Sequence, residues 1–133
     1  MDVQKCKSLK AQFASEADPL VPIGRFFDGN DDPASIGCNL PEHPGMGVFR
    51  DILVGLTRRP DVEAVYARIS ELDPGEGSWP FSDTVLVVGR IEREVLEELV
   101  GPLEPDEVGP ADARMPPLIG ERHDGHVLVV WWD

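Results

Sequence analysis

The spacing of apolar residues predicts amphipathic helices at two places in the chain. In residues 46–59, Val48, Ile52 and Leu56 recur on one helical face, with Phe49 and Leu53 adjoining it. Pro60 follows at once, where a helix cannot continue. This is the clearest helix in the sequence.

A second helix is predicted in residues 91–103. Ile91, Val95 and Leu99 share one face, and a Gly-Pro pair ends the pattern. Glutamates near its start suit the positive end of the helix dipole. The two helices are therefore expected to form the main helical layer of the fold.

The N-terminal region fits a third helix less clearly. In residues 3–15 apolar side chains recur every three or four positions, but a chain terminus equally favours fraying. We expect residues 1–18 to be a helical or frayed appendage. The whole chain, residues 1–133, has the usual length of a single domain.

Five other segments read as strands. Residues 20–27 form an apolar run before a turn-rich stretch, and residues 35–40 are expected to pair with them as a hairpin. Residues 62–72 fit a helix or a strand equally well. We choose strand, because a helix has just ended and the β-branched run of residues 83–89 follows closely. The last strand is predicted at residues 124–133, after an Asp-Gly turn.

This order, β-β-α-β-β-α-β, predicts an α+β fold. Its last six elements match the split βαβ pattern of a ferredoxin-like sandwich, in which an antiparallel sheet carries two main helices on one face. Residues 104–117, rich in proline and acidic side chains, are expected to be a long surface loop.

Charge narrows the choice of partner. The chain has 12 Lys and Arg against 25 Asp and Glu, for a net charge of −13. Such a field repels nucleic acids and anionic membranes and attracts a basic protein. The alternative is that the acidity only keeps the protein soluble. Residues 91–133 carry −8, whereas residues 46–60 carry +2, so the molecule is expected to have an electrostatic polarity.

The cellular location is inferred from the apolar segments and the cysteines. No apolar run approaches the ~18 residues that a membrane span needs, and the first residues lack the apolar stretch of a secretory signal. Cys6 and Cys38 do not make a disulfide framework. A cytoplasmic location with reduced thiols is expected.

The segment from Asp28 to Asp32 begins like a calcium-binding loop, with oxygen ligands at positions one, three and five. The pattern fails at Pro33, where a glycine is needed, and at Asn39, where a glutamate belongs. An acidic turn that presents negative charge to a partner is the preferred interpretation, and no metal site is predicted.

Aromatic residues supply a second candidate contact. Trp79 and Phe81 flank a proline in the loop that enters a central strand, and Asp83 follows. They can serve as rigid contact residues or can cap the core. The residues assigned to partner binding are Asp28, Asn30, Asp31, Asp32, Trp79, Phe81 and Asp83.

Catalytic chemistry has one weak candidate. Cys38 lies five residues before His43, which suggests a thiolate–imidazole pair, but two prolines in this stretch leave the geometry undefined. The sequence contains no P-loop, GxGxxG, nucleophile elbow or CxxC. No cofactor is predicted, and a non-enzymatic protein is favoured.

Three segments carry a resemblance to a known class of proteins. They are FFDGNDDPASIGCNL, WPFSDTVLVV and LEPDEV, and they lie between residues 26 and 108. Together they resemble small uncharacterised bacterial proteins, some of which are similar to the immunity proteins of polymorphic toxin systems. The resemblance implies a non-enzymatic inhibitor that binds and blocks one cognate toxin.

The leading hypothesis is thus an acidic protein-binding module with a basic partner. Two rivals remain: a small enzyme that uses Cys38, His43 and nearby aspartates, and a regulatory domain that binds a small molecule.

Overall fold

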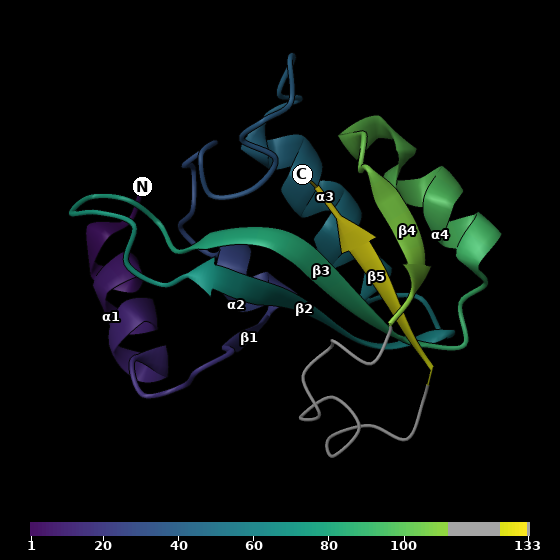
Figure 1. Ribbon diagram of the computed structural model, residues 1–133, viewed down its shortest axis with the longest axis horizontal. Helices are drawn as coiled ribbons and strands as arrows, with labels where there is room; N and C mark the ends of the chain where they lie inside the picture. The colour runs from purple at the N-terminus through teal and green to yellow at the C-terminus, as the bar shows by residue number, and fades with distance from the viewer. Residues whose placement is uncertain (112–125, 133) are drawn as a thin grey trace.

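The computed structural model describes residues 1–111 and 126–132 and shows one antiparallel sheet with helices packed against it (Figure 1). The elements are α1 (Val3–Phe13), β1 (Leu20–Pro22), α2 (Ile23–Phe27), α3 (Met46–Leu56), β2 (Val62–Glu71), β3 (Phe81–Gly89), α4 (Arg93–Val100), the 3₁₀ turn η1 (Gly101–Leu103), β4 (Glu107–Pro110) and β5 (Val127–Trp131). The predicted α+β class is confirmed.

The sheet has five strands in the order β1-β2-β3-β5-β4, and every neighbouring pair is antiparallel. The ferredoxin-like arrangement is not confirmed. β1 and β2 flank α2 and α3 but pair directly with each other, whereas a split βαβ unit places another strand between them. The two edge strands are short, and each ends in a proline, which blunts it against pairing with other chains.

One face of the sheet is a continuous apolar surface. Val21, Ala67, Val85 and Val130 lie opposite one another across four strands, and each is 0% exposed. Strand residues alternate between faces, so a slip of one residue would turn this whole row away from the core. The row therefore specifies the register of the sheet.

All four helices contribute to the core on that face. In Figure 1, α2, α3 and α4 lie behind the sheet and α1 lies at one end. Their buried residues share one cluster with the apolar row and recur at helical spacing: Cys6, Leu9 and Phe13 in α1, Ile23, Phe26 and Phe27 in α2, Phe49, Leu53 and Leu56 in α3, and Leu96 and Val100 in α4. None of the described helices has the length and apolar character that a membrane span requires.

The opposite face of the sheet carries a smaller apolar cluster. Leu20 and Leu86 are buried there, with Tyr66, Val127 and Val129 partly buried around them. These side chains come from alternate positions to those of the main core, as the strand period requires.

The predicted hairpin of residues 20–27 and 35–40 is wrong. The strand stops at Pro22, which has no N–H to donate to the ladder. The following residues form the helix α2, which buries Ile23, Phe26 and Phe27 at helical spacing. The apolar run looked like a strand because a short buried helix and a buried strand have the same composition.

Residues 35–40 form turns rather than a strand. Gly37 has φ +66°, and a Cβ at this position would lie 2.6 Å from the Phe49 ring, so only glycine fits there. Ile36 is buried beside it. The segment is thus an irregular cover over the end of the core.

The two main helices are correctly located, but their buried faces are rotated by one residue. Val48 is 38% exposed and Val95 is 36% exposed, whereas the residues that follow them, Phe49 and Leu96, are fully buried. Each helix carries two adjacent apolar stripes, and periodicity does not decide between them. The first helix also ends at Leu56, before Arg58 and Arg59, rather than at residue 59.

The strand interpretation of residues 62–72 is confirmed, because β2 spans Val62–Glu71. β4 is a strand inside the predicted loop of residues 104–117, of which residues 112–117 lie outside the described part. The predicted last strand is found as β5, and residues 124, 125 and 133 are likewise outside the described residues.

Phe49 offers a test of the helical layer. Its ring stacks on His43 at 5.0 Å between centroids and lies 5.7 Å from Trp132. We expect Phe49→Ala to lower the free energy of unfolding by about 3–5 kcal/mol, through lost burial and a cavity. The exposed neighbour gives the control: Val48→Ala changes it by less than about 0.5 kcal/mol. Urea denaturation measures both, and equal losses would contradict the assigned helix face.

Candidate functional site

The outer carboxylates of the acidic turn, residues 28–32, pair with the N-terminal segment. Asp28 Oδ1 accepts a hydrogen bond from Lys5 Nζ at 2.6 Å, and Asp31 Oδ2 accepts one from the Met1 ammonium at 2.7 Å. The first contact raises the pKa of Lys5, and the second lowers the pKa of Asp31. These two predicted contact residues lie at the surface, but their charge is already paired within the chain.

The inner side chains of the turn support its backbone. Asp32 Oδ2 accepts a hydrogen bond from Trp79 N at 3.1 Å, and its Oδ1 accepts one from Ala34 N at 3.0 Å. Asn30 is buried and donates from Nδ2 to Ser35 Oγ at 3.0 Å. Asn30 and Asp32 thus shape the turn and join it to the loop before β3.

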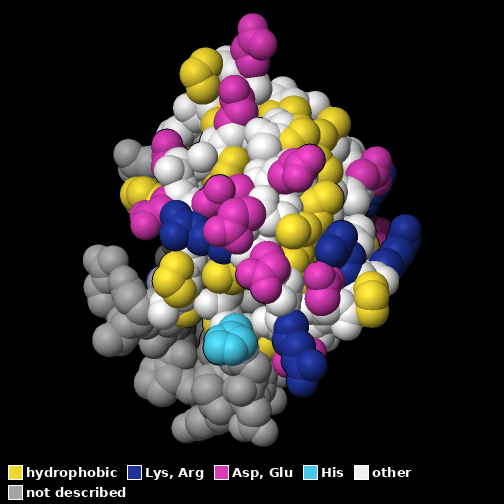
Figure 2. Space-filling view, turned by 90° about the vertical axis from the view of Figure 1, so that its right-hand side faces the viewer, with side chains coloured by type: hydrophobic (Ala, Val, Ile, Leu, Met, Phe, Trp, Pro, Cys, Tyr) yellow, Lys and Arg dark blue, Asp and Glu magenta, His cyan; other side chains and the backbone are white. Residues whose placement is uncertain are grey.

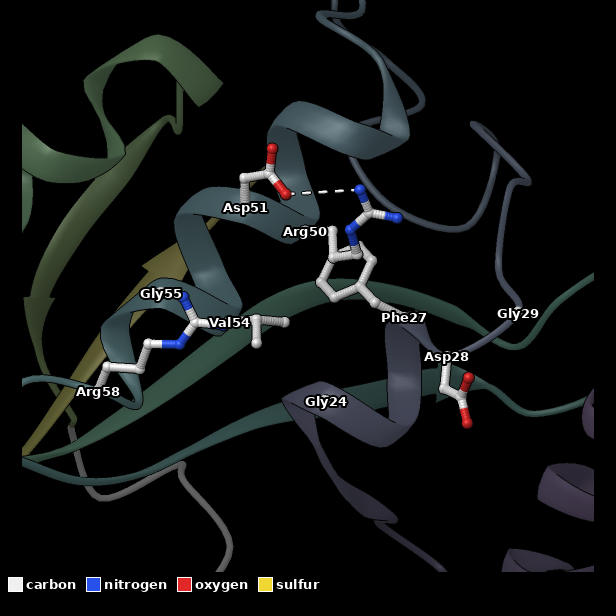
Figure 3. A pocket seen from close by; sticks show the side chains of 9 residues that line it. All are labelled: Gly24, Phe27, Asp28, Gly29, Arg50, Asp51, Val54, Gly55 and Arg58. Carbon is white, nitrogen blue, oxygen red and sulfur yellow. Dashed lines mark hydrogen bonds and ion pairs between the residues drawn. The ribbon is translucent and has the colours of Figure 1, made fainter.

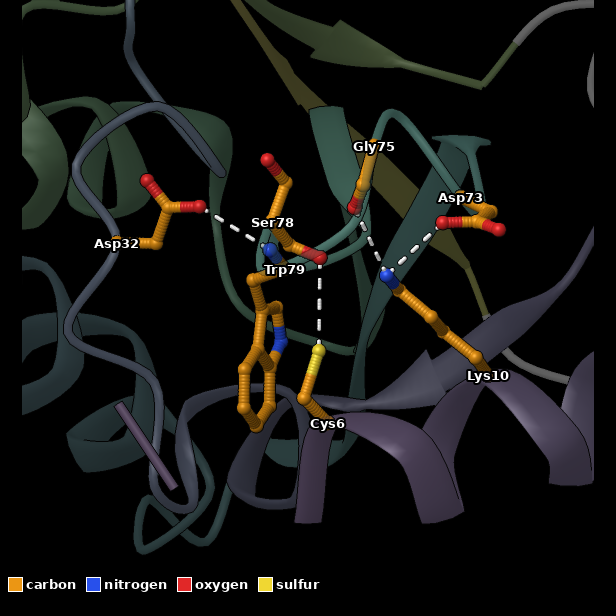
Figure 4. A network of polar contacts seen from close by, with 7 residues as sticks. All are labelled: Cys6, Lys10, Asp32, Asp73, Gly75, Ser78 and Trp79. Carbon is orange, nitrogen blue, oxygen red and sulfur yellow. Dashed lines mark hydrogen bonds and ion pairs between the residues drawn. The ribbon is translucent and has the colours of Figure 1, made fainter. Parts of the chain in front are cut away.

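Trp79 is enclosed rather than exposed. Its side chain is 1% exposed and lies beside Cys6, whose Sγ is 3.4 Å from Ser78 O (Figure 4). Phe81 is half-buried, and Asp83 Oδ1 accepts hydrogen bonds from the hydroxyls of Ser70 and Thr84. The core-capping interpretation of Trp79 fits its burial. A role of these three residues in partner binding stays a prediction, and Trp79 offers no ring surface for it.

The thiol and imidazole of the predicted catalytic pair have other partners. His43 Nδ1 accepts a hydrogen bond from Gly45 N at 3.0 Å, so its Nε2 carries the proton and donates to Ile36 O at 2.9 Å. Cys38 Sγ contacts Asn39 Oδ1 at 3.8 Å. Both ring nitrogens therefore hold the backbone of the 36–45 segment. Within the described residues, no three His, Cys, Asp or Glu side chains lie close enough to hold a metal ion.

An excess of negative charge gathers on another surface. Residues 91–108 contain seven carboxylates and one basic residue, Arg93. Figure 2 shows acidic side chains spread over the side of the molecule formed by α4 and β4, with apolar side chains between them. We call six of these exposed carboxylates, Glu94, Glu97, Glu98, Glu104, Asp106 and Glu107, the acidic face.

The acidic face is hollowed. A cleft of about 380 Å³ between the end of α4 and the start of β4 is lined by Glu97, Glu104, Asp106 and Glu107, together with Arg93. Arg93 Nε donates to Glu97 at 2.9 Å as an i,i+4 pair. Among the described residues, Glu104 and Glu107 form no ion pair. The cleft is thus lined by four carboxylates and one basic side chain.

An exposed aromatic residue borders this surface. Trp131 of β5 lies directly opposite Glu107 of β4 in the sheet register, so both side chains project from the same face. Trp131 is 36% exposed, whereas Trp132 is buried and donates from Nε1 to Leu103 O at 2.9 Å. The charge count pointed to this part of the chain, but only the strand register places the tryptophan beside the carboxylates.

The turn network leads to a prediction about Asp32. Asp32→Ala leaves the Trp79 N–H without its acceptor, and we expect a loss of about 1–3 kcal/mol in the free energy of unfolding. Asp31→Ala removes only an exposed pair and should stay close to the wild type. Chemical denaturation of the two variants measures this. An Asp32→Ala variant as stable as Asp31→Ala would contradict the structural role.

Comparison with known proteins places the chain in a family. The profile of a family described as "Uncharacterized protein YfbO family" matches residues 4–130, which reach from the first helix to the last strand. No curated protein and no solved structure matches the chain. The expected likeness to small uncharacterised proteins is therefore confirmed, while the likeness to toxin immunity proteins stays a prediction. The chain belongs to the YfbO family.

Proposed function

We propose that this protein is a non-enzymatic binding module whose acidic face receives a basic protein. The observation that carries the proposal is the cleft at the end of α4, where four carboxylates meet a single arginine and an exposed tryptophan lies nearby.

The electrostatics of the cleft favour such a partner. Carboxylates of like charge around one hollow repel each other, and this repulsion works against the compact fold. A lysine or arginine side chain that enters the hollow relieves the repulsion and forms charge-assisted hydrogen bonds. Complementary fields of this kind also speed association.

Trp131 supplies the apolar part of the contact. Tryptophan is enriched among the residues that contribute most to protein–protein binding, and its ring face attracts arginine and lysine. A partner that places one basic side chain in the hollow and another on the Trp131 ring would use both features. Apolar contact at Val95, which is also exposed, extends the surface along α4.

The narrower form of the proposal is an immunity-type inhibitor that blocks a basic toxin in the cytoplasm. It is supported by the resemblance of the three segments between residues 26 and 108 and by the strongly negative charge. Two free cysteines, Cys6 and Cys38, fit a reducing compartment. The same negative charge disfavours nucleic acid as the partner.

The catalytic rival lacks support from the geometry. Its two named residues are bonded to other groups, and His43 is held by the backbone on both ring nitrogens. A further alternative, that the acidity serves only solubility, predicts no dependence of any binding on where the charges lie.

A matched pair of variants tests the proposal. The acidic-face variant replaces Glu94, Glu98, Glu104 and Glu107 with glutamine. The control replaces four exposed glutamates elsewhere, Glu16, Glu63, Glu71 and Glu76, so that the net charge changes equally. Proteins from the native host are captured on the wild type, identified, purified and measured again by calorimetry.

We expect the captured partner to be basic, and its Kd to rise by at least about tenfold in the acidic-face variant but little in the control. Trp131→Ala should weaken the same complex, and added salt should weaken it further. A neutral or acidic partner, or an equal loss in both glutamine variants, would contradict the proposal.

A further inference from the structure

A second cleft lies between α2 and α3, away from the acidic face. Its volume is about 390 Å³ (Figure 3). The side chains and backbone that matter most in it are those of Gly24, Phe27, Arg50, Val54, Gly55 and Arg58. Figure 3 shows Arg50 and Arg58 toward its two ends, with Val54 and Phe27 between them.

Neither the backbone conformation nor the packing requires glycine at the two helical glycines of the cleft. Gly24 lies within α2 and Gly55 within α3, and neither has a positive φ. A Cβ built on either residue would meet no other atom within 4 Å, so packing does not exclude a side chain. Glycine inside a helix destabilises it relative to alanine. What the two glycines provide is open space between the helices.

Arg58 supplies uncommitted positive charge. Arg50 and Val54 are four residues apart on α3 and so share one side of the helix, and Arg58 follows in the turn after Leu56. Among the described residues, Arg50 pairs with its neighbour Asp51 at 3.5 Å. Arg58 takes part in no ion pair among the residues that the structure describes. In a chain of net charge −13, an arginine without an ion pair on a cleft, with a second arginine nearby, is a distinct local feature.

The walls and rim limit the ligand. Val54 offers the accessible apolar part of the wall between the two guanidinium groups, and the buried ring of Phe27 closes the cleft behind it. Asp28 and Asp51 also line the cleft, but Asp28 is bonded to Lys5 and Asp51 to Arg50. Guanidinium groups bind carboxylates and phosphates by paired hydrogen bonds. A compact molecule with an oxyanion and an apolar body matches these groups.

We propose that the α2–α3 cleft is a binding site for a small molecule that carries a phosphate or carboxylate group. Arg58 holds the oxyanion, and the apolar body lies over Val54, toward Arg50, in the space that the glycines leave open. This site is separate from the acidic face, which attracts the opposite charge, so either one can fail without the other.

Calorimetric titration with three probes tests the inference: phenyl phosphate, benzoate and inorganic phosphate. We expect phenyl phosphate or benzoate to bind the wild type more tightly than inorganic phosphate, because the ring adds apolar contact. Preference between the two aromatic probes identifies the oxyanion. No detectable binding of any of the three would overturn the proposal.

Variants locate the binding. Arg58→Gln should raise the Kd of the preferred probe by about tenfold or more, and Arg50→Gln should raise it less, because Arg50 already pairs with Asp51. Lys7→Gln, which removes an exposed positive charge from α1, should leave it unchanged. If Lys7→Gln weakens binding as much as Arg58→Gln, the effect is that of net charge and the site is wrong.

A variant that fills the cleft tests probe binding separately from the stability of the fold. Leucine at position 55 has space for its Cβ and favours the helix more than glycine does. Gly55→Leu should therefore keep or raise the Tm while it abolishes probe binding. Retained binding in a stable Gly55→Leu protein would overturn the location of the site. If that variant does not fold, Gly24→Ala is measured in the same way, with a smaller expected loss.

Discussion

β3 pairs with β2 on one side and β5 on the other, and this register sorts the side chains of all three strands between two faces. Val85 and its neighbours across the sheet point toward the helices, so every helix must lie on that face to bury them. The same register brings Trp131 beside Glu107 on the opposite face. The core and the proposed contact surface thus depend on one set of backbone pairings.

The helical layer carries an excess of negative charge at one end and of positive charge at another. α4 and the start of β4 carry carboxylates with a single arginine among them, whereas α3 and the turn after it carry arginines over an open cleft. The acidic turn at residues 28–32 adds little free charge to either side, because Asp28 pairs with Lys5 of α1 and Asp32 holds the loop before β3. Most of its charge serves the fold.

The architecture also limits how a partner can approach. Both sheet edges are short and end in proline, which leaves little unpaired backbone for an added strand. Recognition is therefore expected through side chains. This agrees with the placement of the excess charge on α4, β4 and the turn between them, and of Trp131 on β5.

The sequence by itself determined the α+β class, the positions of the two main helices, and the central strands β2, β3 and β5, because each has a strong period or a β-branched run. Charge counting also located the excess of acid in the C-terminal third. These are properties of short segments, and they need no knowledge of what a segment packs against.

Tertiary structure decided the rest. Which stripe of α3 and α4 is buried depended on the sheet beneath them, since Phe49 rather than Val48 meets Trp132. The turn aspartates were predicted to contact a partner because of their charge. In the structure Asp28 pairs with Lys5, 23 residues away, and Asp31 pairs with the N-terminal ammonium, 30 residues away. Trp79 was buried by a segment distant in sequence, and the cleft of Arg50 and Arg58 formed only when α2 packed on α3. Each of these features depends on contacts between residues far apart in the chain, and the spacing of residues within a short segment does not reveal such contacts.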